Sequence, residues 1–231
     1  MLPEAGQSEA IDLLIVNGTV ITVDGERRVI ENGAVAVQAD RIVAVGCTGE
    51  LAARYAARKT IDATRKAVLP GLIDCHAHAG HGLLKTMGAG DSDAWTRACE
   101  QIYTVGSDET FWYAEARLAA LERLRCGTTT GVCLFGGGDS IMRVDDPKYA
   151  ARHCDAIEET GTRSFLAVGP SHPPAPRVYA DWSSGRRVDR SVSWEQMYET
   201  CEEVIRTRHG GAQGRVNICV TLPVYHPAQS P

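Results

Sequence analysis

The chain has 231 residues, with 24 Lys and Arg against 29 Asp and Glu, so its formal net charge is −5 at pH 7. The length corresponds to one or two domains, and without a basic stripe the chain is unlike a nucleic-acid binder. The longest aliphatic run near the N-terminus, Leu13 to Val16, is too short to cross a membrane, and the first residues lack the features of a signal peptide. The eight cysteines form no CxxC pair, which favours free thiols in a reducing compartment over disulfides or a zinc ribbon. We therefore expect a cytoplasmic protein with no nucleic-acid or membrane partner.

Residues 1–65 have the pattern of a mostly β unit. Residues 12–24 carry Asn17-Gly18 between two β-branched runs, which predicts a hairpin. Residues 34–46 repeat the pattern around Ala39-Asp40, and residues 48–59 predict a short helix capped by Thr48. The unit has little apolar mass of its own, so we expect further strands from elsewhere to complete it.

From residue 66 onward, buried strands alternate with amphipathic helices. This alternation predicts a parallel sheet and an α/β fold, either a doubly wound sheet or the first half of a (β/α)₈ barrel, which needs about 250 residues in full. The nucleotide-binding alternative lacks a GxGxxG or P-loop motif. The long connection 170–192 predicts a lid or a disordered loop. The expected strands are 67–74, 128–135, 162–169 and 215–223, and the expected helices are 107–127, 147–161 and one opened by the capping box Ser193-x-x-Gln196.

The segment Pro70-Gly71-Leu72-Ile73-Asp74-Cys75-His76-Ala77-His78 is the motif that points to chemistry. Residues two apart in a strand share a face, so we expect Asp74, His76 and His78 on one side. Cys75 is expected to face the helices as a packed thiol. Two imidazoles at the C-terminal end of a barrel strand form half of a metal site, with Asp74 as an outer orienting residue. The alternative is two core histidines satisfied by hydrogen bonds.

The run VLPGLIDCHAH, preceded by LLIVNGTVITVD and AVAVQADRIVAVG, resembles the N-terminal half of the amidohydrolase superfamily. Within it, the aminohydrolase/chlorohydrolase and cytosine deaminase-like branch is the most similar. The resemblance implies a TIM-like (β/α)₈ barrel with a small β-sandwich built from both chain ends. Residues 1–65 would supply part of the sandwich, and residues 66–231 would supply truncated barrel strands 1 to 4. It also implies metal-dependent hydrolysis of carbon–nitrogen bonds in small cyclic or heteroaromatic substrates, with His76 and His78 as the two strand-1 ligands.

The family pattern has further ligands that this chain does not offer. They are histidines after strands 5 and 6 and an aspartate after strand 8, and the deaminases add a glutamate that shuttles protons. We expect these catalytic residues downstream of Pro231, so this fragment is expected to be inactive. The predicted end of strand 4, Leu222 to His226, has no bridging lysine or acid. This favours a single divalent ion, zinc or alternatively iron.

Three further histidines follow predicted strands and are candidates for contact with a small-molecule substrate, or else are ordinary loop residues. His153 and His209 are expected at the surface. The open edge of strand 4 predicts a homo-oligomer or an aggregation-prone fragment. A second interpretation is therefore a non-catalytic half-barrel that acts through protein association. The three candidate substrate contacts are His81, His172 and His226.

Overall fold

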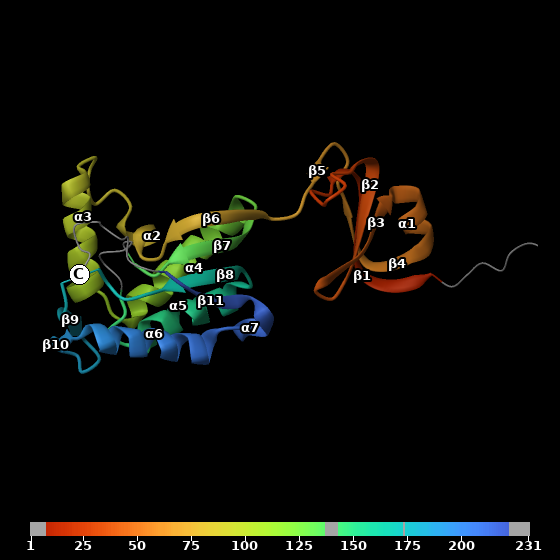
Figure 1. Ribbon diagram of the computed structural model, residues 1–231. Helices are drawn as coiled ribbons and strands as arrows, with labels where there is room; N and C mark the ends of the chain where they lie inside the picture. Colours follow the sequence, from red (N-terminus) through yellow and green to blue (C-terminus); the bar gives the residue numbers. More distant parts are fainter. Residues whose placement is uncertain (1–7, 137–142, 173, 222–231) are drawn as a thin grey trace, which may run out of the picture. The chain divides into compact units, whose positions relative to one another are not determined.

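The computed structural model describes residues 8–136, 143–172 and 174–221. The chain divides into two compact units, Met1–Pro70 and Gly71–Pro231, which carry the labels β1 to β5 and β6 to β11 in Figure 1. Within the described ranges, no helix is long and apolar enough to cross a membrane.

The first unit is a β-sheet with one short helix. Strands β1 and β2 and strands β2 and β3 pair antiparallel, whereas β4 and β5 run parallel to β1, so the main order is β3-β2-β1-β4. Leu14, Ala36 and Leu51 are among the buried residues that join the sheet to the helix. The elements are β1 (Glu9–Ile21), β2 (Val29–Gln38), β3 (Arg41–Cys47), α1 (Thr48–Arg54), β4 (Tyr55–Asp62) and β5 (Ala67–Val68).

The predicted hairpin at Asn17-Gly18 is wrong, because β1 continues straight through it. Asn17 has a φ of 63°, and the pairing with β2 shifts register on either side of Gly18, so the two residues form an irregularity inside one long strand. The Asn17 N–H donates to Thr48 Oγ1 (2.9 Å), and that hydroxyl does not cap α1. The turn at Ala39-Asp40 joins β2 to β3 as predicted.

The second unit contains a four-stranded parallel sheet. Its strands are β6 (Leu72–His78), β7 (Thr128–Leu134), β8 (Arg163–Val168) and β11 (Val216–Val220). Their spatial order, β11-β8-β7-β6, follows the chain without reversal. A doubly wound sheet reverses its strand order at a switch point, whereas a barrel keeps neighbours in chain order. The predicted α/β class is confirmed, and the order favours the barrel interpretation.

Three helices connect these strands, and each begins at a polar cap. The side chains of Asp108, Asp146 and Ser193 each accept a backbone N–H in the first turn, and Ser193 forms the predicted capping box with Gln196. The helices are α4 (Glu109–Arg125), α5 (Pro147–Thr160) and α6 (Trp194–Arg208), and the shorter elements are α2 (His81–Leu84), α3 (Ser92–Gln101), the π-helix η1 (Ile102–Gly106) and α7 (Gly211–Gly214).

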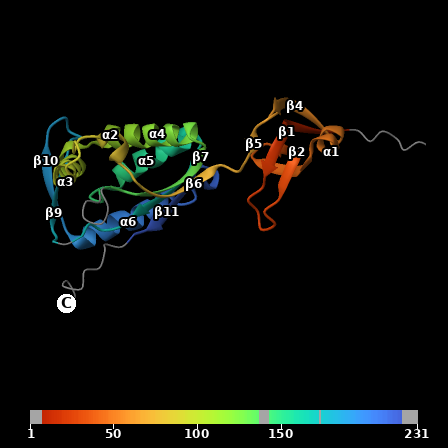
Figure 2. The same cartoon turned by 90° about the horizontal axis from the view of Figure 1, so that it is seen from above.

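The helices bury one face of this sheet (Figure 2). Leu166 and Ile218 lie in the core beneath them, whereas Phe165, which alternates with Leu166, is 40% exposed. On the edge strand β6, Leu72 and Ile73 are 57% and 64% exposed. The expectation of a buried strand over residues 67–74 is therefore wrong for the part of the chain described, because the strand of the second unit is Leu72–His78 and its first two residues are exposed.

His153 is not at the surface, contrary to prediction. It is 2% exposed, and among the described residues neither ring nitrogen has a hydrogen-bond partner. Burial lowers the pKa of His153 to about 3, so the ring is neutral. It shares the buried stripe of α5 with Tyr149, Ala150 and Ile157, at the three- and four-residue spacing that defines one face of a helix.

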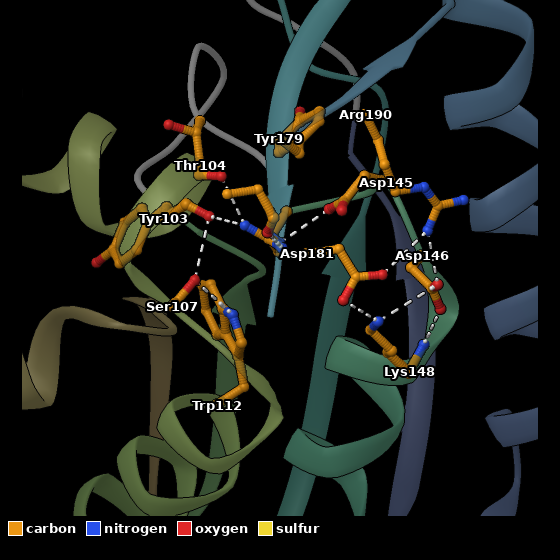
Figure 3. A network of polar contacts seen from close by, with 12 residues as sticks. Tyr103, Thr104, Ser107, Trp112, Asp145, Asp146, Lys148, Tyr179, Asp181 and Arg190 are labelled. Atoms are coloured by element: carbon orange, nitrogen blue, oxygen red, sulfur yellow. Dashed lines mark hydrogen bonds and ion pairs between the residues drawn. The ribbon is translucent and has the colours of Figure 1, made fainter. Parts of the chain in front are cut away.

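The connection 170–192 contains a β-hairpin, so the prediction of a disordered loop is wrong for its described part, and the prediction of a lid stays a prediction. Strands β9 (Arg177–Asp181) and β10 (Val188–Val192) pair antiparallel. Figure 3 shows the polar network that holds them. Arg143, which is 1% exposed, donates to the carbonyls of Tyr103 (2.7 Å), Thr104 (2.9 Å) and Ala180 (2.8 Å). One buried guanidinium thus joins η1 to β9.

Candidate metal centre

The two motif histidines converge at the C-terminal end of β6. The Nε2 atoms of His76 and His78 lie 3.2 Å apart, and the rings meet edge to face with centroids 5.0 Å apart. His76 is exposed and His78 is partly buried. The spacing of two residues in a strand therefore brings the two imidazoles together, as the sequence predicts.

The other ring nitrogen of His78 fixes its tautomer. Nδ1 lies 3.1 Å from the Gly136 carbonyl, and since a carbonyl only accepts, Nδ1 carries the proton. Nε2 of His78 therefore presents a lone pair toward His76. Burial and the neighbouring His76 lower the pKa of His78, so its ring is neutral at neutral pH. A neutral imidazole with a carbonyl behind it is the usual form of a histidine metal ligand.

The separation of the two nitrogens suits a shared ion. Two imidazoles bound to a tetrahedral zinc at about 2.0–2.1 Å have nitrogens about 3.3 Å apart, close to the 3.2 Å between His76 and His78. Imidazole also suits both zinc and iron. A catalytic zinc has three protein ligands, and among the described residues no group of three or more His, Cys, Asp or Glu is placed to hold a metal. The structure therefore provides two ligand positions.

Asp74 contacts the strand end and a helix rather than an imidazole ring. Its Oδ2 lies 3.0 Å from Arg123 Nε on α4, and its Oδ1 accepts the backbone N–H of His76 (3.3 Å). The β6–β7 pairing shifts register between Asp74 and Ala77. Asp74 thus touches His76 through the main chain, and its role as an outer orienting residue stays a prediction. Cys75 is exposed, so its predicted packing as a core thiol is wrong.

His81 packs behind His78. It begins α2, and its ring stacks on the His78 ring with centroids 4.7 Å apart and an interplanar angle of 18°. Burial and the neighbouring His78 lower the pKa of His81 to about 4. Trp95 meets its ring edge to face at 5.1 Å. The structure thus places His81 beside the candidate ligands, and its contact with substrate stays a prediction.

The two remaining candidate histidines are His172 and His226. His172 follows β8, and its carbonyl accepts from the Arg177 guanidinium (3.4 Å). The described residues that line the cavity beside the imidazoles do not include His172. His226 lies outside the described residues. Substrate contact by His172 or His226 stays a prediction.

A cavity of about 410 Å³ opens beside the imidazoles, and one of its lining residues, Glu115, was missed by the sequence interpretation. Glu115 of α4 is 1% exposed, and burial raises its pKa to about 7 although the N–H groups of Gly80 and Gly82 lower it. The sequence carries no signal for its burial, because a glutamate is expected at the surface. The cavity is lined by His76, Ala77, His78, His81, Gly82, Lys85, Glu115, Ala119, Glu122 and Arg123.

No protein-family model matches the chain, but curated proteins do. The 5-methylthioadenosine/S-adenosylhomocysteine deaminase of Desulforudis audaxviator is 32% identical over 209 residues, which cover 89% of this chain and 40% of the relative. The protein of the same name from Syntrophobacter fumaroxidans is 39% identical over 127 residues, 54% of this chain and 28% of the relative. The chain spans about two fifths or less of the length of these curated relatives.

Solved structures share the fold. An adenosine deaminase from Xanthomonas campestris with bound zinc superposes with a TM-score of 0.70 at 23% identity, over 92% of this chain and 43% of that one. The zinc complex of atrazine chlorohydrolase from Arthrobacter aurescens TC1 superposes with a TM-score of 0.68 at 23% identity, over 94% of this chain and 48% of that one. The guanine deaminase of E. coli superposes with a TM-score of 0.62 at 18% identity, over 97% of this chain and 47% of that one. These structures confirm the predicted fold class, and each extends well beyond the matched part.

Proposed function

Because this chain belongs to the amidohydrolase superfamily, corresponding to its N-terminal half, we propose that it supplies the first two ligands of a metal-dependent hydrolase. The reaction is the hydrolysis of carbon–nitrogen bonds in small cyclic or heteroaromatic molecules. The relatives named above are deaminases of nucleoside-type compounds, and the fold neighbours act on adenosine, guanine and atrazine by name. The observation that carries the proposal is the convergence of two Nε2 atoms at 3.2 Å.

Zinc is the ion that the proposal assigns to His76 and His78, with iron as the alternative. Two fold neighbours carry zinc in their solved structures, and the tautomer of His78 fits the role. A bound zinc ion lowers the pKa of its water to about 7 and so provides hydroxide at neutral pH. The remaining ligands and the general base are expected downstream of Pro231, as the family pattern implies.

The residues of this chain bind and orient in the proposed reaction. The Gly136 carbonyl holds His78 in the tautomer whose Nε2 is free to ligate. Asp74 holds the His76 backbone and is itself held by Arg123. His81 stacks on one face of the His78 ring. These contacts position the two nitrogens before an ion arrives, which reduces the cost of binding.

The proposal extends to the cellular location of the protein and to the molecules that it binds. We place the protein in the cytoplasm, with a small molecule as its substrate and with residues 1–65 as part of a β-sandwich. Association remains the second candidate function, because the exposed Leu72 and Ile73 lie on β6, which pairs with β7 alone among the described strands. A half-barrel that acts through another protein would bury this edge and would not need His76 and His78.

The test combines metal analysis with an ammonia-release assay. The gene is read past Pro231, and the product of a continuing frame is compared with the 231-residue chain on adenosine, guanine and an aminotriazine. We expect about one zinc ion and turnover in the longer protein, weak substoichiometric zinc and no turnover in the short chain, and loss of both properties in His76→Ala and His78→Ala. His209→Ala serves as the control once circular dichroism shows that it folds, because His209 at the end of α6 bonds the Ile218 backbone and does not line the imidazole cavity. Unchanged zinc content and turnover in both site variants would refute the proposal.

A further inference from the structure

The turn that follows the histidine strand is packed against two buried side chains. Gly80 has a φ of 97°, and a Cβ there would lie 2.4 to 2.5 Å from the ring of Tyr103. A Cβ on Gly82 would lie 3.1 Å from Glu115 Oε1. The backbone of this turn, Gly80-His81-Gly82, therefore lies directly against Tyr103 on one side and Glu115 on the other.

The Tyr103 side of the turn is fixed from behind. Tyr103 is fully buried, and its carbonyl accepts from Arg143 Nη1 (2.7 Å) and Ser107 Oγ (3.1 Å), as Figure 3 shows. Ser107 in turn accepts from Trp112 Nε1 (3.1 Å). These contacts hold Tyr103 in place without help from the turn.

The Glu115 side depends on a single carboxylate. Glu115 Oε1 accepts the Gly82 N–H (3.3 Å), whereas Oε2 is buried and has no hydrogen-bond partner among the described residues. Burying a carboxylate costs several kcal/mol or more when it is not compensated. Glu115 lines the imidazole cavity despite this cost of burial. Its hydrogen bond to the turn gives a physical reason for a buried glutamate at this position.

The position of this turn determines where the His81 ring packs against His78. His81 lies between the two glycines, and its ring stacks on His78 at 4.7 Å. On the other nitrogen, Gly136 accepts from Nδ1 of His78 (3.1 Å). The His78 ring is therefore held by a hydrogen bond and by a stacked ring, and Glu115 reaches the second of these through Gly82.

We propose that Glu115 is a positioning residue for His78, acting through the Gly82 N–H and the His81 ring. This inference rests on the proposed function, in which His76 and His78 hold a metal ion. Glu115 does not ligate. It fixes the position of the turn against α4. His81 then supports the His78 ring, and Nε2 of His78 is directed at Nε2 of His76.

Two substitutions at Glu115 separate this role from a general contribution to folding. Glu115→Gln keeps an acceptor for the Gly82 N–H and removes the charge, whereas Glu115→Leu keeps the volume and removes the acceptor. Glu122→Gln is the matched control, because Glu122 lies on the same helix and cavity wall but pairs with Lys85 (2.6 Å), with both side chains about half exposed. Circular dichroism establishes that each variant folds.

The measurements are zinc affinity, by competition with a chromophoric chelator, and the imidazole NMR signals of the zinc-free chain. We expect Glu115→Leu to weaken zinc binding about 10- to 100-fold, the usual effect of removing an outer support, and to shift the signals of His78 and His81. Glu115→Gln is expected to retain most of the affinity, and Glu122→Gln all of it. A folded Glu115→Leu chain with the original affinity and unshifted signals would overturn the inference.

Two further outcomes remain decisive. If the unaltered chain binds no zinc, the proposed function fails for this chain, and the imidazole signals alone decide the positioning role: a shift in Glu115→Leu but not in Glu115→Gln supports it, and no shift refutes it. If Glu115→Leu does not fold, amide hydrogen exchange decides. Slow exchange of the Gly82 amide in both the unaltered chain and Glu115→Gln supports the inference, and exchange at the rate of a free peptide overturns it.

Discussion

Replacing Arg143 with methionine tests whether the buried polar network holds the second unit together. The guanidinium donates to three backbone carbonyls, and its Nε lies 2.8 Å from Asp145 Oδ1 with both side chains fully buried. Tyr149 covers it, with the guanidinium carbon 3.9 Å from the ring centroid. Methionine fills most of the volume, but it removes one donor from each of the three carbonyls and leaves the Asp145 carboxylate without its cation.

The magnitude follows from the loss of one partner of a buried pair, which costs about 3–5 kcal/mol. A domain typically has about 5–15 kcal/mol of stability in all, so Arg143→Met removes a large part of it. With a urea m-value of about 2 kcal/mol/M, the midpoint falls by about 2 M. Tryptophan fluorescence is the suitable signal, because Trp95, Trp112, Trp182 and Trp194 all lie in the unit Gly71–Pro231.

The control is Lys85→Met, which breaks the half-exposed ion pair with Glu122 and is expected to cost about 0–1 kcal/mol. The double variant Arg143→Met/Asp145→Asn should recover part of the loss, because the uncompensated carboxylate is then removed. Equal urea midpoints for Arg143→Met and Lys85→Met would show that the buried network does not stabilise the second unit.

Three other predictions concern pH, the glycine turn and the open edge. Burial raises the pKa of Glu115 from 4.5 to about 7, so between these two pH values the folded chain holds a proton that the unfolded chain has released. The free energy of unfolding therefore falls as pH rises from 4.5 to about 7. The urea midpoint should fall less over this range in Glu115→Gln than in the unaltered chain. Gly80→Ala should destabilise the second unit by about 2–4 kcal/mol through backbone strain and the clash with Tyr103. The control Gly127→Ala, at a φ of 83° with no atom within 4 Å of the added Cβ, should cost only the strain of about 1–2 kcal/mol. Equal melting curves for the two variants would contradict the packing of Gly80. The chain should associate with rising concentration in sedimentation velocity, and Ile73→Lys, which puts a charge on the exposed edge strand, should reduce that association; a monomer at all concentrations would count against it.

The elements that the sequence predicts well are those with a local signal. The helix from Trp194 to Arg208 is marked by its capping box, and α5 begins at Pro147 and ends before Gly161, whose φ of 76° suits glycine. The convergence of His76 and His78 also follows from a local rule, the two-residue repeat of a strand. Each of these features depends on a few neighbouring residues.

The features that the sequence does not predict depend on which segments meet. Asn17-Gly18 has the composition of a hairpin, but the long pairing of β1 with β2 and β4 keeps the strand continuous. The burial of Arg143 depends on carbonyls about 40 positions away in the chain. Glu115 is charged, so its burial becomes visible only once the turn at Gly82 is packed against α4.

The most direct test of the central claim is X-ray absorption at the zinc edge on the zinc-loaded chain. We expect two imidazole nitrogens at about 2.0–2.1 Å in the unaltered chain, and one after His76→Ala or His78→Ala. The eight cysteines offer the competing ligands, and Cys75 beside the motif is exposed. A first shell of sulfur at about 2.3 Å, unchanged by either histidine substitution, would contradict the claim that His76 and His78 hold the ion.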